Sequence, residues 1–301
     1  MKNEKVAFIG SGMIGSGLAV NAMMHGYKTY LQTRKQVEKM KNRVIHIFEI
    51  MVENEICTQA EADKYAKNAV YTTSIEEAVA DAIFIQESGP ENLEIKKQLI
   101  QKIAGFCPKD SIIASSTSKL LPSDLQEGCR NPERVIVGHP YHPSYLLPLI
   151  EICGGNQTTE EYIQKAKSHY ESMGKIAIIC RKEASGYIVN RASWAVNEEA
   201  RKTVLEGFCS VEEMDKAIMY GPGLRMAVTG QLMTIALGVE GGARAQAAKY
   251  GREPSPEDEI IAQGIEEAMA NRPVVIGNDE ASIGDFRDKV IVEVLRMQGL
   301  L

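Results

Sequence analysis

The sequence predicts an α/β fold, in which a doubly wound, mostly parallel sheet is followed by an all-helical C-terminal domain. A short apolar run, KVAFI (5–9), leads directly into a glycine-rich turn and then into residues with helical spacing. Strand-like runs alternate with helical stretches up to residue 184, and almost all later signals are helical. We therefore expect two domains, residues 1–184 and residues 185–301.

The glycine turn is the most informative local pattern. Gly10 permits a tight turn, Gly12 lets the backbone approach a pyrophosphate, and Gly15 allows the following helix to pack close to the strand. Met13 and Ile14 open that helix, whose free N–H groups and dipole favour phosphate. An ordinary glycine turn would have the same composition. The order strand, turn, helix favours a Rossmann-type dinucleotide site.

The next strand, KTYLQ (28–32), ends without the acidic residue that usually binds the ribose of NAD. Thr33, Arg34 and Lys35 stand there instead. A hydroxyl and two cations would bind a 2′-phosphate, which a carboxylate would repel. We therefore expect NADP or NAD as cofactor, with NADP favoured. The alternative is that Arg34 and Lys35 only begin a solvated helix.

The remaining elements follow in order. Later strands are predicted at 69–73, 82–86, 111–115, 134–138 and 176–180, and helices between them at 35–53, 91–104 and 159–173. The C-terminal domain is expected to consist of helices at 186–206, 211–220, 226–250 and 256–271, whose apolar faces could support a homodimer.

Composition excludes several classes of protein. A net charge of −6 without a concentrated basic face argues against nucleic acid as a partner. No apolar run reaches about 18 residues, and the first strand starts at once, so we expect neither a membrane span nor a signal peptide. The six cysteines form no CxxC pair, so we expect reduced thiols, no metal site and a cytoplasmic enzyme.

Three segments carry groups suited to alcohol chemistry. Residues 115–125 (SSTSKLLPSDL) and His139 follow predicted strands, at the sheet edge where α/β proteins bind ligands. Glu151 comes twelve residues after His139, and GYIVNR (186–191) opens the helical domain. These segments supply a hydroxyl, an imidazole, a carboxylate and an amide. Such a set could remove a proton from an alcohol while hydride leaves its carbon.

At these residues the chain resembles the 3-hydroxyacyl-CoA dehydrogenase family, and within it the branch of carnitine and gulonate dehydrogenases. The resemblance covers nearly the whole chain. Beside the glycine turn, the matching motifs are QESGPENLEIKKQL, SSTSKLLPSDLQ, NPERVIVGHP, YLLPLIE, GYIVNR and YGPGLR. They occur in the family's order and spacing.

The resemblance implies roles for four residues. Ser118 and Asn190 would hydrogen-bond the 3-oxygen of the substrate, His139 would be the catalytic base, and Glu151 would orient His139. Elementary chemistry agrees, because imidazole accepts and releases protons near neutral pH and a carboxylate fixes its tautomer. Strand-end position alone would leave a capping histidine and a surface carboxylate as alternatives.

The resemblance also implies that Glu91 and Lys96 contact the cofactor. The chain departs from the family at His142, where asparagine is usual. An imidazole replaces one hydrogen bond of an amide but not a donor and an acceptor together, so His142 is a cofactor-binding candidate of uncertain role. His139 and His142 lack a third ligand, which argues against a metal site.

The function expected is that of an NAD(P)-dependent 3-hydroxy acid dehydrogenase, which oxidises a secondary 3-hydroxyl reversibly to a 3-ketone on a carnitine-like or other small substrate. A trimethylammonium group would want aromatic faces. Candidates are Tyr141, Tyr145, Tyr187, Trp194 and Tyr220. One alternative is a short-chain 3-hydroxyacyl-CoA (3-hydroxybutyryl-CoA) dehydrogenase. An alternative of another class is a non-catalytic, crystallin-like protein that binds the cofactor.

Overall fold

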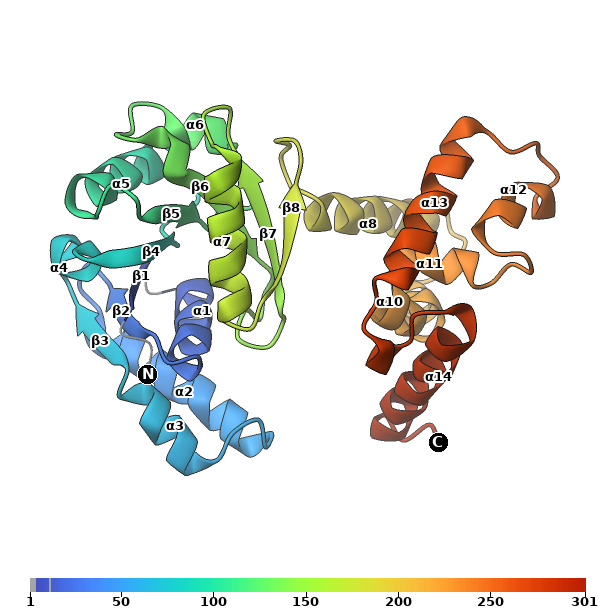
Figure 1. The fold of residues 1–301 in the computed structure, drawn as a ribbon. Coiled ribbons are helices and arrows are strands. Elements are labelled where there is room, and N and C mark those ends of the chain that lie inside the picture. The colour runs from blue at the N-terminus through green and yellow to red at the C-terminus, as the bar shows by residue number, and fades with distance from the viewer. Residues whose placement is uncertain (1–3, 11) are drawn as a thin grey trace. The chain divides into compact units, whose positions relative to one another are not determined.

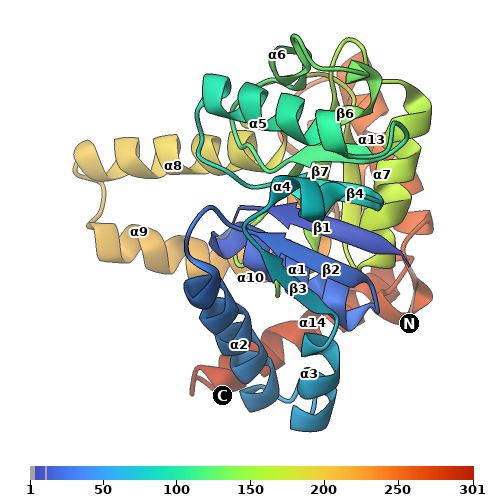
Figure 2. The ribbon, with the colours of Figure 1, turned by 90° about the vertical axis from the view of Figure 1, so that its left-hand side faces the viewer.

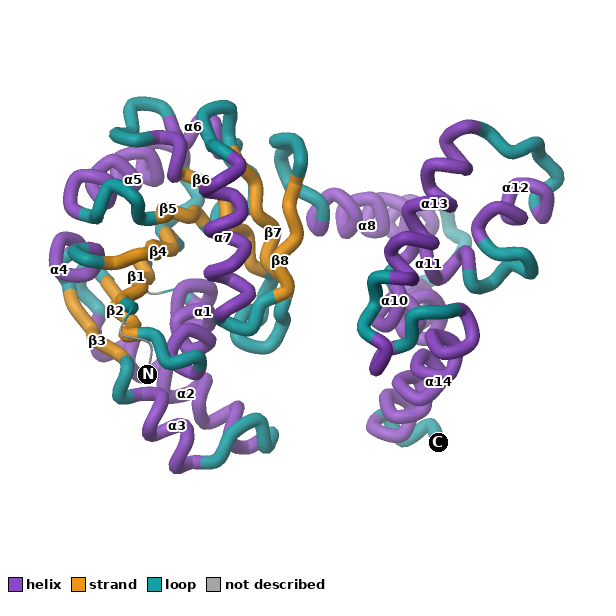
Figure 3. The backbone as a smooth tube through the Cα atoms, in the orientation of Figure 1, coloured by secondary structure: helices purple, strands orange, loops and turns teal. Residues whose placement is uncertain are grey.

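The computed structural model describes residues 4–10 and 12–301, so Ser11 of the glycine turn lies outside the described residues. The chain divides into two compact units, one ending at Ala195 and the other running from Val196 to Leu301. All strands of the described chain lie in the first unit, and only helices follow them (Figures 1 and 3). The predicted fold class is confirmed. The functional boundary at residue 184 stays a prediction.

The first unit is built on one eight-stranded sheet in the order β3-β2-β1-β4-β5-β6-β7-β8. Figure 2 shows β3, β2, β1 and β4 side by side. The strands are β1 (Lys5–Ile9), β2 (Lys28–Gln32), β3 (Ala69–Thr72), β4 (Ala82–Glu87), β5 (Ile112–Ser115), β6 (Val135–Pro140), β7 (Leu149–Gly154) and β8 (Ile176–Cys180). Strand order reverses between β1 and β4, and ligands bind beyond the carboxyl ends of strands at such a switch point.

Strand β7 is absent from the sequence-based prediction, which named no strand between residues 138 and 176. β7 pairs with β6 and is the one antiparallel neighbour in the described sheet. The prolines around it hid the run LIEICG, because proline suppresses a strand signal. The strand forms because the folded chain brings this run beside β6. The pairing sets His139 directly opposite Glu151.

Helices cover both faces of the sheet. The helices of the first unit are α1 (Met13–Met24), α2 (Val37–Glu53), α3 (Gln59–Ala66), α4 (Ile75–Val79), α5 (Leu93–Phe106), α6 (Pro122–Gln126) and α7 (Glu160–Ser172), with a 3-10 turn η1 at Pro132–Arg134. Val6 and Phe8 point to one face, where α1, α2 and α7 pack. Ala7 and Ile9 point to the other, beneath α4, α5 and α6. Strand residues alternate between the two cores, as a doubly wound sheet requires.

The second unit contains shorter helices than the sequence predicts. Its elements are α8 (Val189–Leu205), which begins in the first unit, α9 (Val211–Ile218), the π-turn η2 (Met219–Gly223), α10 (Leu224–Thr229), α11 (Gln231–Ala236), η3 (Ala243–Ala245), α12 (Gln246–Lys249), α13 (Pro256–Ala270), η4 (Val274–Ile276) and α14 (Glu280–Met297). The single helix expected over 226–250 is wrong. Gly230 has φ +72°, which ends α10 because a right-handed helix needs negative φ. Helix α14 was not expected at all.

No helix among residues 4–10 and 12–301 is long and apolar enough to cross a membrane.

Candidate active site

The turn between β1 and α1 leaves room for a ligand. A Cβ on Gly10, where φ is +115°, would lie 2.5 Å from the carbonyl oxygen of Ser88, so no side chain fits there. A Cβ on Gly15 would lie 2.4 Å from the carbonyl oxygen of Gly10, so this glycine lets α1 pack against the turn. A Cβ on Gly12 would meet no described residue within 4 Å. Gly12 is thus not required by packing, and its free space suits a pyrophosphate.

A cavity of about 910 Å³ opens beside this turn. It is lined by Gly10, by the end of β2, by the start of α4, by the Ser88–Pro90 turn and by one side of α5. Thr33 is buried in its wall and Arg34 is exposed there, together with Lys102 and the carboxylate Glu76. Lys35 is not part of the lining. The volume, the glycine turn and the amino end of α1 fit a dinucleotide.

His139 and Glu151 are in contact on the neighbouring strands β6 and β7. Nδ1 of His139 lies 2.7 Å from Oε2 of Glu151, and both side chains are buried. The ring of Tyr187 lies 5.6 Å from the imidazole, centroid to centroid. No hydrogen bond of Nε2 to any described residue accompanies these contacts, so the outer nitrogen is left for another partner. A carboxylate on Nδ1 favours the tautomer that carries its hydrogen on that atom.

Glu151 is also held from the side of α8. Its other oxygen, Oε1, accepts hydrogen bonds from the backbone N–H groups of Ile188 at 2.7 Å and Val189 at 2.9 Å. N–H groups at a helix start have no partner within the helix, so these two amides are free to fix the position of the carboxylate. Asn190 is the next residue, half-buried in the first turn of α8. The same two amides therefore fix the chain that carries Asn190 beside the His139–Glu151 pair.

Tyr187 connects the loop that carries Ser118 to the His139–Glu151 pair. Its hydroxyl donates to the carbonyl oxygen of Leu120 at 2.6 Å, while its ring contacts His139. The loop of Ser118 is thereby tied to the strand of His139. Tyr187 is 2% exposed, so its ring is core and is not available to surround a cationic ligand. Sequence reasoning missed this bridging role, although the residue stands inside the motif GYIVNR.

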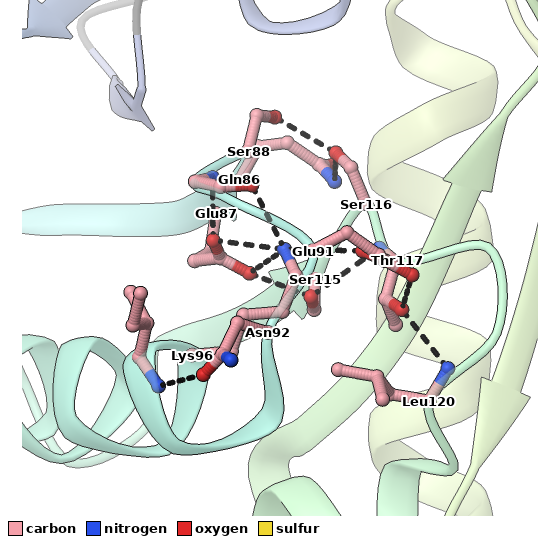
Figure 4. Close-up of polar contacts among 12 residues, drawn as sticks. Gln86, Glu87, Ser88, Glu91, Asn92, Lys96, Ser115, Ser116, Thr117 and Leu120 are labelled. Atoms are coloured by element: carbon pink, nitrogen blue, oxygen red, sulfur yellow. Dashed lines mark hydrogen bonds and ion pairs between the residues drawn. The ribbon is translucent and has the colours of Figure 1, made fainter.

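Polar groups at the carboxyl ends of β4 and β5 form a second network (Figure 4). Oε1 of Glu91 accepts from the backbone N–H of Ser118 at 3.1 Å and from the Thr117 hydroxyl. Lys96 is 1% exposed, and its ammonium contacts both carboxylate oxygens of Glu87 at 2.9 and 3.1 Å. The resemblance implied direct cofactor contacts for Glu91 and Lys96. The structure buries Lys96 behind the turn that lines the cavity, and reveals Glu87, which sequence reasoning missed.

His142 lies exposed in the loop between β6 and β7. Neighbouring residues dock this loop: Ser144 donates to the carbonyl oxygen of Ile14 at 3.1 Å, and Lys175 donates to the carbonyl oxygens of Ser144 and Leu147. Burial without a carboxylate partner lowers the pKa of Lys175 to about 8. The loop is therefore held against the amino end of α1. Within the described chain, no three His, Cys, Asp or Glu side chains gather as metal ligands would.

Comparison with known proteins identifies the family of the chain. The model of the 3-hydroxyacyl-CoA dehydrogenase NAD-binding domain matches residues 5–184, and that of the 3-hydroxyacyl-CoA dehydrogenase C-terminal domain matches residues 186–273. The chain belongs to the 3-hydroxyacyl-CoA dehydrogenase family. It is accordingly an NAD-dependent oxidoreductase that acts on a CH–OH group. The family resemblance noted in the sequence is confirmed.

Named curated relatives match nearly all of the chain. The L-carnitine dehydrogenase of Streptomyces coelicolor is 36% identical, over 99% of this chain and 96% of its own. That of Bacillus cereus is 33% identical, over 98% and 92% respectively. Among solved structures, an NAD⁺-dependent 5-formyl-3-hydroxy-2-methylpyridine 4-carboxylic acid 5-dehydrogenase has the same fold, with a TM-score of 0.74, 21% identity and 99% of both chains covered. The 3-hydroxybutyryl-CoA dehydrogenase of Escherichia coli has a TM-score of 0.66 at 25% identity, over 88% of this chain and 57% of its own.

Proposed function

We propose that this protein oxidises the 3-hydroxyl of a small, carnitine-like 3-hydroxy acid reversibly to a ketone, with His139 as the catalytic base. The observation that carries the proposal is the buried His139–Glu151 pair, whose 2.7 Å contact leaves Nε2 of His139 facing no described protein partner. The cofactor cavity and glycine turn lie at the carboxyl ends of strands in the same sheet.

In the mechanism we infer, the Nδ1–H group of His139 donates a hydrogen bond to Glu151, so Nε2 carries the lone pair. Nε2 takes the proton of the substrate hydroxyl, and Glu151 stabilises the imidazolium that forms. The backbone amides of Ile188 and Val189 hold the Glu151 carboxylate in place through two hydrogen bonds. Bound nicotinamide supplies the hydride acceptor. In reduction, the imidazolium returns the proton.

Ser118 and Asn190 are proposed to hydrogen-bond the 3-oxygen. The supporting geometry is indirect: Ser118 lies in the loop that Tyr187 ties to His139, and Asn190 follows the amides that hold Glu151. Donors aimed at this oxygen would stabilise the alkoxide character that develops as hydride leaves. Ser118→Ala and Asn190→Ala are therefore expected to lower kcat more than they raise KM.

The substrate class rests on the relatives, several of which are L-carnitine dehydrogenases. A panel of L-carnitine, L-gulonate, 3-hydroxybutyrate and 3-hydroxybutyryl-CoA, followed at the absorbance of the reduced nicotinamide, tests it. We expect oxidation of a free acid in preference to the thioester. Preference for 3-hydroxybutyryl-CoA would support the alternative enzyme. Cofactor binding without turnover of any of the four would contradict the proposal.

We also propose that NADP(H) is used at least as well as NAD(H). Arg34 and Lys102 line the cavity, and the position usually taken by an acidic ribose ligand is Thr33. Glu76 lines the same cavity and would oppose a phosphate placed near it. The variant Thr33→Asp with Arg34→Ala should shift preference toward NAD, and steady-state kinetics with both cofactors measure it. A strong preference of the unaltered enzyme for NAD would refute the proposal.

For assembly, we propose a homodimer formed by the helical unit. Its apolar side chains include Leu205, Phe208 and Val211, which are 79%, 78% and 65% exposed. Large apolar side chains that are this exposed at the end of α8 and the start of α9 favour association. We also propose a cytoplasmic location, because six cysteines without a CxxC pair favour reduced thiols.

A further inference from the structure

The chain contains one tryptophan, and it lies beside the candidate active site. Trp194 belongs to α8, in the part of that helix that falls within the first compact unit. The residue is 43% exposed, although tryptophan is on average highly buried. An exposed indole next to residues that are proposed to bind substrate offers a ligand an aromatic face with a negative potential.

The backbone at Gly186 fixes this indole. Gly186 has φ +83°, and a Cβ built on it would lie 2.4 Å from both Cη2 and Cζ3 of Trp194. The outer edge of the ring therefore packs directly against the glycine, where a larger residue has no room. Tyr187 is the next residue, and its ring lies 5.6 Å from the imidazole of His139, centroid to centroid. The same short turn thus supports the indole and contacts the proposed base.

Helical spacing places Trp194 on the same side of α8 as Asn190. Residues four apart on a helix are surface neighbours, with Cβ atoms about 5–6 Å apart. In a carnitine-like acid, the quaternary nitrogen is bonded to the carbon next to the one that carries the hydroxyl. A hydroxyl bound by Asn190 therefore brings this nitrogen within reach of the indole, since a ring attracts a cation from within about 6 Å.

The indole has the chemistry that a quaternary ammonium group requires. Such a group has no N–H to donate, so hydrogen bonds from it cannot be the means of recognition. The face of an aromatic ring attracts it, and tryptophan gives the strongest attraction. In the described part of the chain, lysines lie over the rings of Tyr30, Tyr71 and Tyr162, and none of these contacts involves Trp194. The exposed indole is thus available to a cation from outside the protein.

We propose that Trp194 is a specificity-determining residue, whose exposed indole binds a quaternary ammonium group on the carbon next to the one that is oxidised. The inference rests on the proposed function for the role of Asn190 and for the position of the hydroxyl. It concerns a part of the substrate that the His139–Glu151 pair cannot select, because a general base acts on the hydroxyl alone.

The first experiment compares two substrates of the same shape. L-Carnitine and its uncharged isostere, in which carbon replaces the quaternary nitrogen, are oxidised by the unaltered chain, by Trp194→Leu and by Trp194→Phe. Leucine keeps an apolar contact but has no ring, so KM for L-carnitine should rise about tenfold in Trp194→Leu and about threefold or less in Trp194→Phe. For the isostere, KM should stay within about twofold, and kcat should change less than about threefold for either substrate.

Tyr250→Leu is the matched control, because it removes a ring that is 66% exposed in the helical unit. Its KM for both substrates should equal that of the unaltered chain.

The second experiment requires no turnover. Because the chain has one tryptophan, the intrinsic indole fluorescence of the unaltered protein reports Trp194 alone. The probe is the betaine that lacks the 3-hydroxyl and cannot be oxidised, and the control is the uncharged isostere of that betaine, both titrated with oxidised cofactor bound. We expect a saturable change in emission at concentrations of the betaine at least about fivefold lower than those of the isostere.

Three results would overturn the inference. An equal rise of KM for both substrates in Trp194→Leu would give the indole a structural role only. Equal saturation by the betaine and its isostere would show that the indole does not recognise charge. An indole covered by a second copy of the chain would respond to neither probe. The proposed function fails differently: oxidation of none of the panel substrates would refute it, whereas the titration of the unaltered chain would still decide whether Trp194 binds the cation, even if neither variant folds.

Discussion

His139 is oriented by three different parts of the chain. Glu151 contacts its Nδ1 from β7, Tyr187 covers its ring from the segment before α8, and β6 carries its backbone. A general base needs its reacting nitrogen held within hydrogen-bond reach of the proton it removes. Glu151 fixes Nδ1 of the imidazole and Tyr187 packs against the ring. The orientation of Nε2 is therefore set although Nε2 itself makes no contact with Glu151 or Tyr187.

Replacing His139 tests this assignment. His139→Gln should lower kcat by about 10² to 10⁴, because an amide cannot take the hydroxyl proton. The dissociation constant for NADH should stay within about a factor of two, since no contact of His139 reaches the cofactor cavity. The measurements are steady-state kinetics and fluorescence titration. His46→Gln, on the exposed face of α2, is the control, and near-normal turnover in His139→Gln would exclude the residue from proton transfer.

Lys175 gives a pH-dependent prediction at the same scale. Burial lowers its pKa from 10.5 to about 8, so between about pH 8 and 10.5 the unfolded chain holds a proton that the folded chain has released. Stability contributed by this lysine must therefore rise with pH across that window, while the cost of burying its charge is fully present below it. We expect the free energy of unfolding of the unaltered chain, relative to that of Lys175→Met, to increase from pH 8 to 10. Denaturant unfolding measures it, with the exposed Lys64→Met as control. A flat or falling difference would show that Lys175 is not buried in this way.

At the scale of elements, β6 depends on a close approach by α7. The Tyr170 hydroxyl bonds to Oε1 of Gln86, whose amide donates to the carbonyl oxygen of Gly138 at 3.1 Å. A Cβ on Gly138 would lie 1.8 Å from that hydroxyl oxygen. Only glycine lets the fully buried Tyr170 sit over the strand that leads to His139.

Gly138→Ala should therefore destabilise the fold by about 1–3 kcal/mol or more, the usual cost of overpacking a core. Its matched control is Gly264→Ala in α13, where an added Cβ meets no described residue within 4 Å. That control should be neutral or stabilise by up to about 1 kcal/mol, because alanine favours helix over glycine. Urea unfolding compares the two. Equal stability of both variants would contradict the close packing at Gly138.

Sequence reasoning succeeded where the signal is local. The alternation in β1 and the spacing of Gly10 and Gly15 follow from neighbours in the chain, so the sheet and its glycine turn were predictable. Strand β7 was not, because pairing with β6 and β8 stabilises that proline-flanked run as a strand. The contacts within the site also form only in the folded chain. The sequence therefore predicted which residue types stand at the strand ends, but not how they contact one another. The ion pair of Glu87 with Lys96 and the bridging role of Tyr187 escaped notice, since these partners lie 9 and 67 residues away in sequence.

At the scale of the whole molecule, the helical unit has little core of its own. Its described core cluster is built on four buried residues, Met233, Ala236, Ile265 and Ile283, while α9 buries none. We expect light scattering to give twice the chain mass of 33.1 kDa. Leu205→Glu with Phe208→Glu should shift the protein toward monomer without changing NADH affinity, with Val274→Glu as a control outside α8 and α9. A monomer at micromolar concentration in the unaltered chain would refute the dimer.

The register of β6 on β7 has a consequence for how this enzyme could diversify. His139 faces Glu151 because the two strands pair, and the loop between them, residues 141–148, takes no part in that contact. A slip of one residue would turn Glu151 to the opposite face of the sheet, so the ladder itself enforces the pairing. The connecting loop is therefore not needed to position the groups that transfer the proton. Its length and side chains can be exchanged to suit a different acid, while the imidazole and its carboxylate stay in register.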